Sequence, residues 1–360
     1  MIKNIYSIYC MVLDRIIEKY KNNVSIATSC SHSSLQIFDG ARKEGFKSIG
    51  IAIGKKPDFY DAFPLAKPDE FIVLKSYNEI NKNAEKFYRK KAIIVPHGSF
   101  VEYMGAKNFM KLKVPTFGNK AVLEWESDRE KERKWLERAG LKLPEIVENP
   151  KDINKPVIVK YYGAKGGKNF FIAKSYEDFK RKIEKKPYMI QEFLIGTRYY
   201  IHYFYSPIVK EGYRTAKGSL QLLSIDRRDE TNIDEAHRLG SFSELEKMGI
   251  QPTFVVTGNT PIVIRESLLP KVFEMGKRVV EESYKLFGGI IGPFCLETVI
   301  TDKLEIKVFE ISARIVAGTN LFISGSPYSD LIQPYLSTGR RIAQEIKIAL
   351  REDKMEEIIT

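Results

Sequence analysis

Residues 156–196 carry the strongest signal for the fold and have the sequence PVIVKYYGAKGGKNFFIAKSYEDFKRKIEKKPYMIQEFLIG. A branched apolar run ends on Lys160, a glycine-rich loop follows, and a second strand-like run begins at Phe170. This pattern predicts strand, loop and strand rather than strand, loop and helix. Glycine lets backbone N–H groups approach an anion closely, and neighbouring lysines add positive charge, so the loop can cover a polyphosphate. The loop residues that carry this prediction are Gly163, Lys165, Gly166 and Gly167.

The remainder of the stretch predicts a helix over residues 176–184 and a third strand over 188–194, which closes on Gly196. These elements together look like a clamp over a nucleotide. A glycine-rich match alone is weak support for that function. The charged residues elsewhere in the chain must therefore decide it.

The composition indicates a protein with more than one folded core. The chain has 360 residues, of which 43% are hydrophobic and 12% aromatic, and this predicts two or three domains. The three cysteines are far apart and lack metal-ligand spacing, which is typical of the reducing cytoplasm. Residues 1–23 predict an amphipathic helix rather than a signal peptide, because charges soon break the apolar run, and Met11 is an alternative start. No run is long enough to span a membrane.

The net charge of +12 raises the question of nucleic-acid binding. Lysines are interspersed with glutamates in every region, however, as on a solvated and thermophilic surface. The sequence contains no helix-turn-helix, zinc-finger or aromatic RNA-binding signature. We therefore expect neither nucleic acid nor a membrane as a partner.

Strand-like and helical segments alternate over residues 24–95, which predicts a parallel sheet with helices on its faces. Polar breaks follow two of these strands, SHSS at residues 31–34 and PHGS at residues 96–99. Ligands bind at the carboxyl ends of such strands, where hydroxyls, a histidine and helix-start N–H groups suit a phosphate monoester. The first break could instead simply cap the next helix. Two breaks in equivalent positions favour a binding site.

Helical spacing predicts further helices over residues 121–139, 268–287 and 339–351, the last preceded by Ser337 and Thr338 as caps. Residues 198–205 and 219–225 predict an antiparallel pair of strands. A dense polar run, residues 226–232, follows the second of them. This run is either a solvated loop or a set of groups folded over nucleotide and metal.

Two glutamates stand out because strand alternation puts each on a face with apolar neighbours. Glu297 lies in the strand-like run 292–300 and Glu310 in the run 304–311. A short turn joins the runs, so they look like a hairpin with both acids in one interior, where carboxylates are costly unless paired or coordinating a cation. Asn320, further along, offers an amide oxygen, and such hard oxygen donors suit Mg²⁺. The alternative is a structural ion pair, such as Glu310 with Arg314.

The lysine strand, the glycine loop, the QEFL segment, the two acids and Asn320 stand in the order found in the ATP-grasp superfamily, which the chain resembles. Over nearly its whole length the sequence is more specifically similar to the archaeal formate-dependent ligases of purine synthesis, the 5-formaminoimidazole-4-carboxamide ribotide synthetases. Each resembling segment is weak alone, but eight in order are strong. The segments are SHSSLQIFDGARKEGF, IVPHGSF, VPTFGNK, VIVKYYGAKGG, GTRYYIHYFYSP, VVTGNTPIVIRESLLPK, IGPFCLE and FEISARIVAGTN.

The resemblance implies an ATP-grasp fold, of mixed α/β and α+β class. A parallel α/β substrate domain is expected over residues 1–115, a clamp over 116–205, and a C-terminal subdomain with the metal site over 206–360. In the implied reaction ATP phosphorylates formate to formyl phosphate, which the amine of 5-aminoimidazole-4-carboxamide ribotide then attacks. The implied partners are these small molecules, Mg²⁺ or Mn²⁺, and further copies of the chain in a homo-oligomer.

The resemblance also implies roles for individual residues. For the nucleotide, Lys160 and Lys120 would contact phosphates with the glycine loop, Glu192, Phe193 and Leu194 would line the adenine pocket, and Glu230 would lie near the ribose. For the other ligands, His32, Ser99 and Asn259 would hold the ribotide, Glu297, Glu310 and Asn320 the metal, and Arg265 and Arg314 the substrate anion or formyl phosphate. For His97 and His202 we expect packed, hydrogen-bonded side chains.

One departure from the expected pattern follows the arginine of the SAR segment, where Val316 and Ala317 replace an acid and a glycine. It leaves open a diverged ligase for another amine or carboxylic acid, or a purine-nucleotide binding protein without catalysis. A dinucleotide-dependent oxidoreductase is disfavoured, because the glycine loop joins strand to strand and the expected acid is missing.

Overall fold

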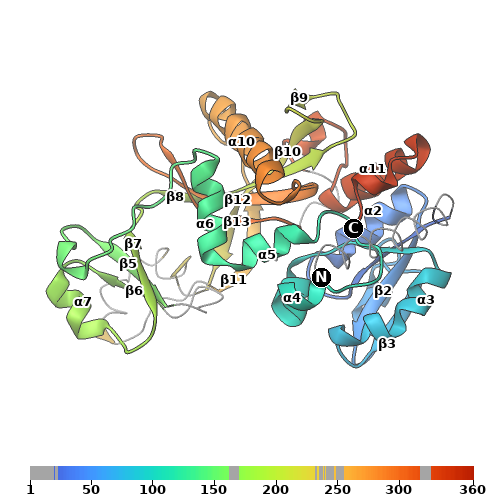
Figure 1. The fold of residues 1–360 in the computed structure, drawn as a ribbon, viewed down its shortest axis with the longest axis horizontal. Helices are drawn as coiled ribbons and strands as arrows, with labels where there is room; N and C mark the ends of the chain where they lie inside the picture. The colour runs from blue at the N-terminus through green and yellow to red at the C-terminus, as the bar shows by residue number, and fades with distance from the viewer. Residues whose placement is uncertain are drawn as a thin grey trace, which may run out of the picture.

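The computed structural model describes Tyr20 and residues 23–161, 170–231, 233–234, 238, 240, 247–248, 255–316 and 326–360. Three sheets follow one another along the long axis of the molecule (Figure 1). Several sequence predictions lie outside the described residues. These are the first helix, the loop residues Gly163, Lys165, Gly166 and Gly167, and the pair Ala317 and Asn320.

The N-terminal sheet is parallel, as predicted, with strand order β3-β2-β1-β4. Its two inner strands, β1 and β2, are buried along nearly their whole length, because helices cover both faces. Its elements are β1 (Ser25–Ser29), α2 (Ser34–Lys43), β2 (Lys47–Ile53), β3 (Glu70–Leu74), α3 (Ala84–Arg89) and β4 (Ala92–Ile94).

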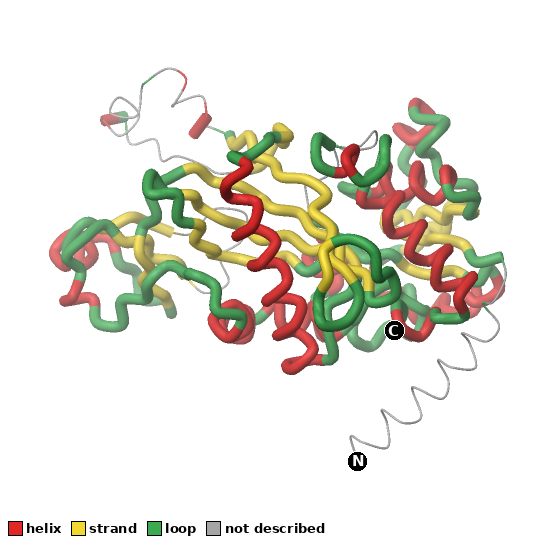
Figure 2. The backbone as a smooth tube through the Cα atoms, turned by 90° about the horizontal axis from the view of Figure 1, so that it is seen from above, coloured by secondary structure: helices red, strands yellow, loops and turns green. Residues whose placement is uncertain are grey.

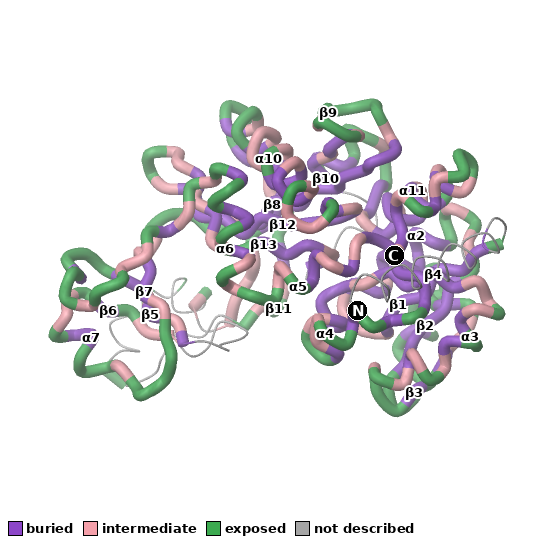
Figure 3. Tube along the Cα trace, in the orientation of Figure 1, coloured by how far each residue is buried: buried purple, intermediate pink, exposed green. Residues whose placement is uncertain are grey.

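The central sheet has the order β11-β10-β8-β12-β13 and is antiparallel throughout. Figure 2 shows the long helix α10 lying across this sheet, and Figure 3 shows buried backbone concentrated in its inner strands. Gly276 of α10 permits the close approach, since a Cβ there would lie 2.7 Å from the Tyr203 ring. The elements are β8 (Thr197–Ser206), β10 (Ser219–Glu230), β11 (Val256–Pro261), α10 (Leu269–Phe287), β12 (Gly292–Ile300) and β13 (Ile306–Ser312), with β9 (Tyr213–Arg214) beside β10.

The clamp forms a separate lobe with strand order β6-β5-β7. The two predicted strands are confirmed, because β5 and β6 pair antiparallel; the residues between them lie outside the described ranges. Val157, Val159, Ala173, Phe179 and Ile190 form a small core of their own. The elements are β5 (Val157–Tyr161), β6 (Phe170–Ala173), α7 (Tyr176–Lys182) and β7 (Tyr188–Glu192).

The single helix predicted over residues 121–139 is wrong, because two helices occupy this region, α5 (Ala121–Ser127) and α6 (Arg129–Arg138). Asp128 between them has an extended backbone, with φ −108° and ψ 111°, and its carboxylate accepts the N–H groups of the next turn. A new N-cap therefore restarts the helix in another direction.

The domain boundaries expected from the sequence remain a prediction, and sheet membership bears on one of them. Strand β8 was assigned to the clamp by the range 116–205, but it is hydrogen-bonded between β10 and β12 of the central sheet. A division that follows the sheets would fall near Gly196 instead.

The last helix, α11 (Thr338–Glu352), packs on α2 of the N-terminal domain (Figure 1). The two helices touch at glycines, since a Cβ on Gly339 would lie 2.2 Å from the Gln36 carbonyl oxygen. Ser337 caps the helix, as predicted, by accepting the Arg340 N–H. Among the described residues, no helix is both long enough and apolar enough to cross a membrane.

Candidate active site

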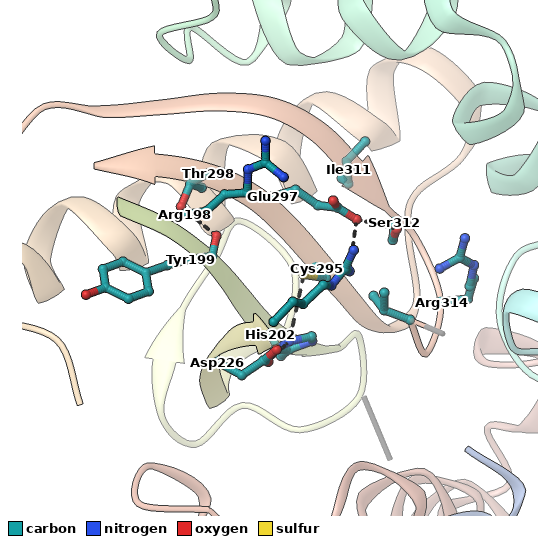
Figure 4. A network of polar contacts seen from close by, with 12 residues as sticks. Arg198, Tyr199, His202, Asp226, Cys295, Glu297, Thr298, Ile311, Ser312 and Arg314 are labelled. Carbon is teal, nitrogen blue, oxygen red and sulfur yellow. Dashed lines mark hydrogen bonds and ion pairs between the residues drawn. The ribbon is translucent and has the colours of Figure 1, made fainter. Parts of the chain in front are cut away.

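Glu297 and Glu310 lie directly opposite each other in the β12–β13 hairpin, as the strand alternation predicted. The Glu297 side chain is buried, and its Oε1 accepts a hydrogen bond from the Ser312 hydroxyl at 3.3 Å (Figure 4). The same oxygen accepts a hydrogen bond from Arg228, also at 3.3 Å. The expectation that both acids are buried is wrong for Glu310, which keeps access to solvent although protein surrounds it. The pair therefore borders an open space rather than a sealed core.

The charge around this pair suits a cation. Desolvation, followed by repulsion from Glu297, raises the pKa of the Glu310 carboxyl to about 7. A divalent cation between the acids would remove this repulsion and favour the charged forms. Among the described residues no group of three or more His, Cys, Asp or Glu side chains could hold a metal. The two facing carboxylates are oxygen donors of the kind that divalent cations such as Mg²⁺ prefer.

The predicted alternative, an ion pair between Glu310 and Arg314, is wrong. Arg314 instead pairs with Glu126 of α5, with Nη2 and Oε1 2.5 Å apart, and the other oxygen of Glu126 accepts the Ala313 N–H at 2.9 Å. Glu132 of α6 likewise accepts the Ile311 N–H at 2.7 Å. These two glutamates thus accept hydrogen bonds from backbone N–H groups at the end of β13 and just after it.

Cations from two strands lie beside the acids. Lys160 of β5 lies over the Phe309 ring, 5.8 Å from its centroid, and Arg198 of β8 lies over the same ring at 5.6 Å. Glu230 of β10 pairs with Arg198 at 3.5 Å. Desolvation lowers the pKa of Lys160, whereas the charge of Glu310 acts in the opposite direction. The structure thus brings Lys160 and Glu230 together with the acid pair.

Glu192 connects the clamp to the central sheet. Its two carboxylate oxygens lie 2.7 and 2.8 Å from the Lys307 ammonium of β13, and one also accepts the Glu145 N–H. The next residue, Phe193, donates its N–H to the Pro156 carbonyl at 3.1 Å. Phe193 and Leu194 are both half-buried.

The two N-terminal polar loops meet, as their equivalent positions predicted. The Ser99 hydroxyl donates to the Ser31 hydroxyl at 2.8 Å and lies 3.1 Å from Nε2 of His32. Helix capping does not explain the first loop, because Ser33 has φ 71° and its hydroxyl donates to the Val316 carbonyl at 3.3 Å. Desolvation lowers the pKa of His32, so this imidazole is neutral at pH 7.

His97 and His202 are packed and hydrogen-bonded, as expected. His97 is fully buried, accepts the Ser99 N–H on Nδ1 and lies 3.1 Å from the Ser29 carbonyl through Nε2. Burial lowers its pKa to about 3. His202 lies against Asp226, and its Nε2 is 3.9 Å from the Cys295 sulfur (Figure 4).

Within the described part of the chain, three further residues that the resemblance assigned to the site have no hydrogen bond or ion pair with Glu297 or Glu310. Lys120 is 5% exposed and donates to the Leu112 carbonyl at 2.9 Å. Arg265 is exposed on the turn before α10. Asn259 of β11 lies opposite Arg228 in the β10–β11 ladder.

Four further residues lie at this site although they were not predicted from the sequence pattern: Arg228, Ser312, Glu126 and Glu132. Arg228 is one of several charged residues in the polar run 226–232, and nothing in the sequence distinguishes it from its neighbours. Its guanidinium stacks on Tyr200, 3.5 Å from the ring centroid. Ser312 shares a face of β13 with Glu310, a signal that alternation did contain. The helical acids gave no signal, because a charged helix normally faces solvent.

Val316, at the departure from the expected pattern, packs in a buried cluster with Tyr200 and Cys295. Its side chain is 4% exposed, so valine fits the apolar packing at this position.

Comparison with known proteins is consistent with this geometry. Residues 175–360 match a family described as "Domain of unknown function (DUF1297)", and residues 26–147 match "Protein of unknown function (DUF1246)". A curated protein of Methanococcoides burtonii, 5-formaminoimidazole-4-carboxamide-1-(beta)-D-ribofuranosyl 5'-monophosphate synthetase, is 64% identical over 97% of this chain and 98% of its own length.

Solved structures agree on the fold. The IMP biosynthesis protein PurP from Thermococcus kodakaraensis is 32% identical, with a TM-score of 0.73 over 93% of this chain and 100% of its own. N5-carboxyaminoimidazole ribonucleotide synthetase from Thermotoga maritima is 15% identical, with a TM-score of 0.60 over 91% of this chain and 76% of its own. The expected ATP-grasp fold is confirmed.

Proposed function

The chain belongs to the family of 5-formaminoimidazole-4-carboxamide ribotide synthetases, and from this premise we propose that it uses ATP and formate to formylate 5-aminoimidazole-4-carboxamide ribotide. It is then an ATP-dependent carbon–nitrogen ligase of purine synthesis. One observation carries the proposal furthest. The end of β13 and the residues after it run from Glu310 past Arg314 to Ile315, which forms a parallel bridge with His97 of the second polar loop. A nucleotide site and a ribotide site would therefore share one short segment.

The reaction proceeds in two transfers. A formate oxygen attacks the γ-phosphorus of ATP, the bond from phosphorus to the β–γ bridging oxygen breaks, and ADP leaves with that oxygen. The ribotide amine then attacks the carbon of formyl phosphate, inorganic phosphate leaves, and the amine nitrogen loses a proton. Positioning and positive charge supply most of the stabilisation in phosphoryl transfer.

For the first transfer, Lys160 and the glycine loop neutralise the phosphates, with Glu230 on the ribose side and Glu192, Phe193 and Leu194 around the adenine. Glu297 and Glu310 would hold Mg²⁺ or Mn²⁺, and Asn320 would supply a further oxygen donor, as the family resemblance implies. The metal, when bound, neutralises charge on the phosphate oxygens. Arg228 pairs with Glu297 at 3.3 Å, which supports its holding that acid in place before the metal arrives.

For the second transfer, His32, Ser99 and Asn259 bind the ribotide. His32 is neutral at pH 7, so it can accept a hydrogen bond from the ribotide amine or a proton released from it. Ser99 fixes the imidazole through the 3.1 Å contact with Nε2. Closure of the clamp over these groups would keep water from hydrolysing formyl phosphate.

The test is an omission assay with purified protein. ADP and the formylated ribotide should form together only when ATP, a divalent metal, formate and the ribotide are all present. Formation of neither product with all four present would refute the proposal. ATP and ribotide binding without turnover, measured by calorimetry, would instead favour a nucleotide-binding protein. The cytoplasmic location and the homo-oligomer expected from the sequence remain predictions, and light scattering tests the second.

A further inference from the structure

The His97 side chain makes directed contacts beyond those that packing requires. It is 0% exposed, its Nδ1 accepts the Ser99 N–H at 3.3 Å, and its Nε2 lies 3.1 Å from the Ser29 carbonyl oxygen. Its ring meets the His32 ring edge to face, with centroids 5.6 Å apart, and its backbone forms a parallel bridge with Ile315. His97 therefore contacts both polar loops and the segment after β13.

The two hydrogen bonds of His97 determine which of its ring nitrogens carries a proton. A backbone N–H can only donate and a carbonyl oxygen can only accept, so Nδ1 holds the lone pair and Nε2 holds the proton. Burial lowers the pKa of His97 to about 3, so the ring is neutral at pH 7 and keeps this form. His97 thus holds the backbone of the second polar loop in one position at Ser99.

Ser99 carries this order on to His32. The Ser99 side chain is fully buried, and its hydroxyl donates its single proton to the Ser31 hydroxyl at 2.8 Å. The same oxygen lies 3.1 Å from Nε2 of His32. Because the proton of the Ser99 hydroxyl is already used, its oxygen can only accept at this second contact. The proton of the neutral His32 ring is therefore on Nε2.

The other ring nitrogen of His32 is available to a ligand. Among the described residues no hydrogen bond reaches this atom, Nδ1, and the side chain is only half-buried. Desolvation, followed by the charge of Arg314, lowers the pKa of His32, so Nδ1 keeps its lone pair at pH 7. A neutral imidazole with a fixed lone pair is suited to act as a general base.

We propose that His97 is a positioning residue that acts through Ser99 to present Nδ1 of His32 to the ribotide amine. This inference rests on the proposed function and deepens it by assigning the atom that takes the proton. In the second transfer the amine lone pair forms the bond to the formyl carbon, and the bond from that carbon to the phosphate oxygen breaks. One amine proton moves to Nδ1, while Nε2 keeps its proton and its contact with Ser99. The imidazolium then releases the proton to solvent.

The deciding measurement is the tautomer of His32, read from nitrogen–proton NMR spectra of protein labelled with nitrogen-15 at histidine. The chain has four histidines, so substitution of each assigns the signals. In the wild type His32 should carry its proton on Nε2, and the ribotide should shift the Nδ1 signal. A proton on Nδ1 of His32 in the wild type would overturn the inference, whatever the variants do.

Two polar variants of His97 test its role. His97→Asn places an amide oxygen near the position of Nδ1, so it should still accept the Ser99 N–H and keep the tautomer of His32. His97→Gln places its amide near Nε2 instead, so the Ser99 N–H loses its acceptor and both tautomers of His32 should appear. His97→Gln should therefore lower kcat about tenfold or more, with the KM for ATP within about twofold. His97→Asn should recover most of that loss.

Phe100→Leu is the matched control for packing. Phe100 is fully buried and lies edge to face against His97, with ring centroids 5.6 Å apart, but its side chain has no hydrogen-bonding group. This variant should keep the tautomer of His32 and a kcat near that of the wild type. Equal decreases in kcat for Phe100→Leu and His97→Gln, with the tautomer of His32 unchanged in both, would show that His97 only packs.

The tautomer is measured without turnover, which separates this inference from the proposed function. Circular dichroism verifies that the variants fold. If the wild type forms no formylated product, yet the tautomer of His32 depends on His97 and its Nδ1 signal shifts with the ribotide, the proposed function fails and the positioning role stands. If product forms and His32 keeps one tautomer in His97→Gln, the positioning role alone is wrong.

Discussion

Replacement of Arg228 by glutamine should destabilise the protein, because it leaves the buried carboxylate of Glu297 without its cationic partner. Arg228 is 14% exposed and Glu297 is 7% exposed, with Nη2 and Oε1 3.3 Å apart. Arg228 and the Ser312 hydroxyl both donate to Glu297, so Arg228→Gln removes the charged donor and leaves the Ser312 hydroxyl. It also removes the stacking of the guanidinium on Tyr200. Metal binding to Glu297 should recover part of the lost stability.

The magnitude follows from the geometry of this pair. Breaking a buried ion pair by removing one partner typically costs about 3–5 kcal/mol. The contact is a single one and Ser312 remains, so we expect a destabilisation at or just below the lower end of this range, about 2–3 kcal/mol. For a chain of 360 residues, with an unfolding entropy of about 0.76 kcal/mol/K, that corresponds to a decrease in Tm of roughly 3–4 °C.

The assay is thermal unfolding of a double-mutant cycle. Arg228→Gln should lower the Tm, and Arg228→Gln combined with Glu297→Gln should recover much of the loss, because the uncompensated charge is gone. Addition of Mg²⁺ and ADP should raise the Tm of Arg228→Gln more than that of the wild type. An unchanged Tm in Arg228→Gln, or a double variant less stable than both single variants, would refute the reasoning.

Three further predictions concern activity. Glu310→Gln should abolish ADP release while circular dichroism stays unchanged, because it removes one of two acidic metal ligands, and full activity would exclude Glu310 from the metal site. Because the pKa of Glu310 is raised to about 7, the acid is increasingly protonated as pH falls below this value. At low Mg²⁺ the kcat/KM should therefore fall from pH 8 to pH 6, and higher Mg²⁺ should shift the inflection to lower pH, since metal competes with the proton. A profile insensitive to Mg²⁺ would contradict this assignment. Ser99→Ala should raise the KM for the ribotide about tenfold through loss of the contact with His32, with the KM for ATP unchanged as the internal control. An equal change in both KM values would point to a general structural effect.

The local sequence pattern was enough to predict the strands and loops on which the site residues lie. Alternation in two adjacent runs predicted the hairpin that sets Glu297 opposite Glu310. The glycine-rich segment predicted the β5–β6 pair, and the repeated polar breaks predicted that the His32 and Ser99 loops meet. Each of these depends on periodicity or on the end of a strand, which a short window of residues fixes.

Only the tertiary structure decided which groups pair across the chain. Glu126 accepts a hydrogen bond from the Ala313 N–H, although the two residues are 187 positions apart in the sequence. The same carboxylate forms an ion pair with Arg314, for which the sequence had suggested Glu310 as the partner. Asp128 divides the predicted helix, and β8 joins the central sheet rather than the clamp. The physical reason is that secondary structure follows local periodicity, whereas the partner of a buried charge depends on which distant group the completed fold brings within a few ångströms.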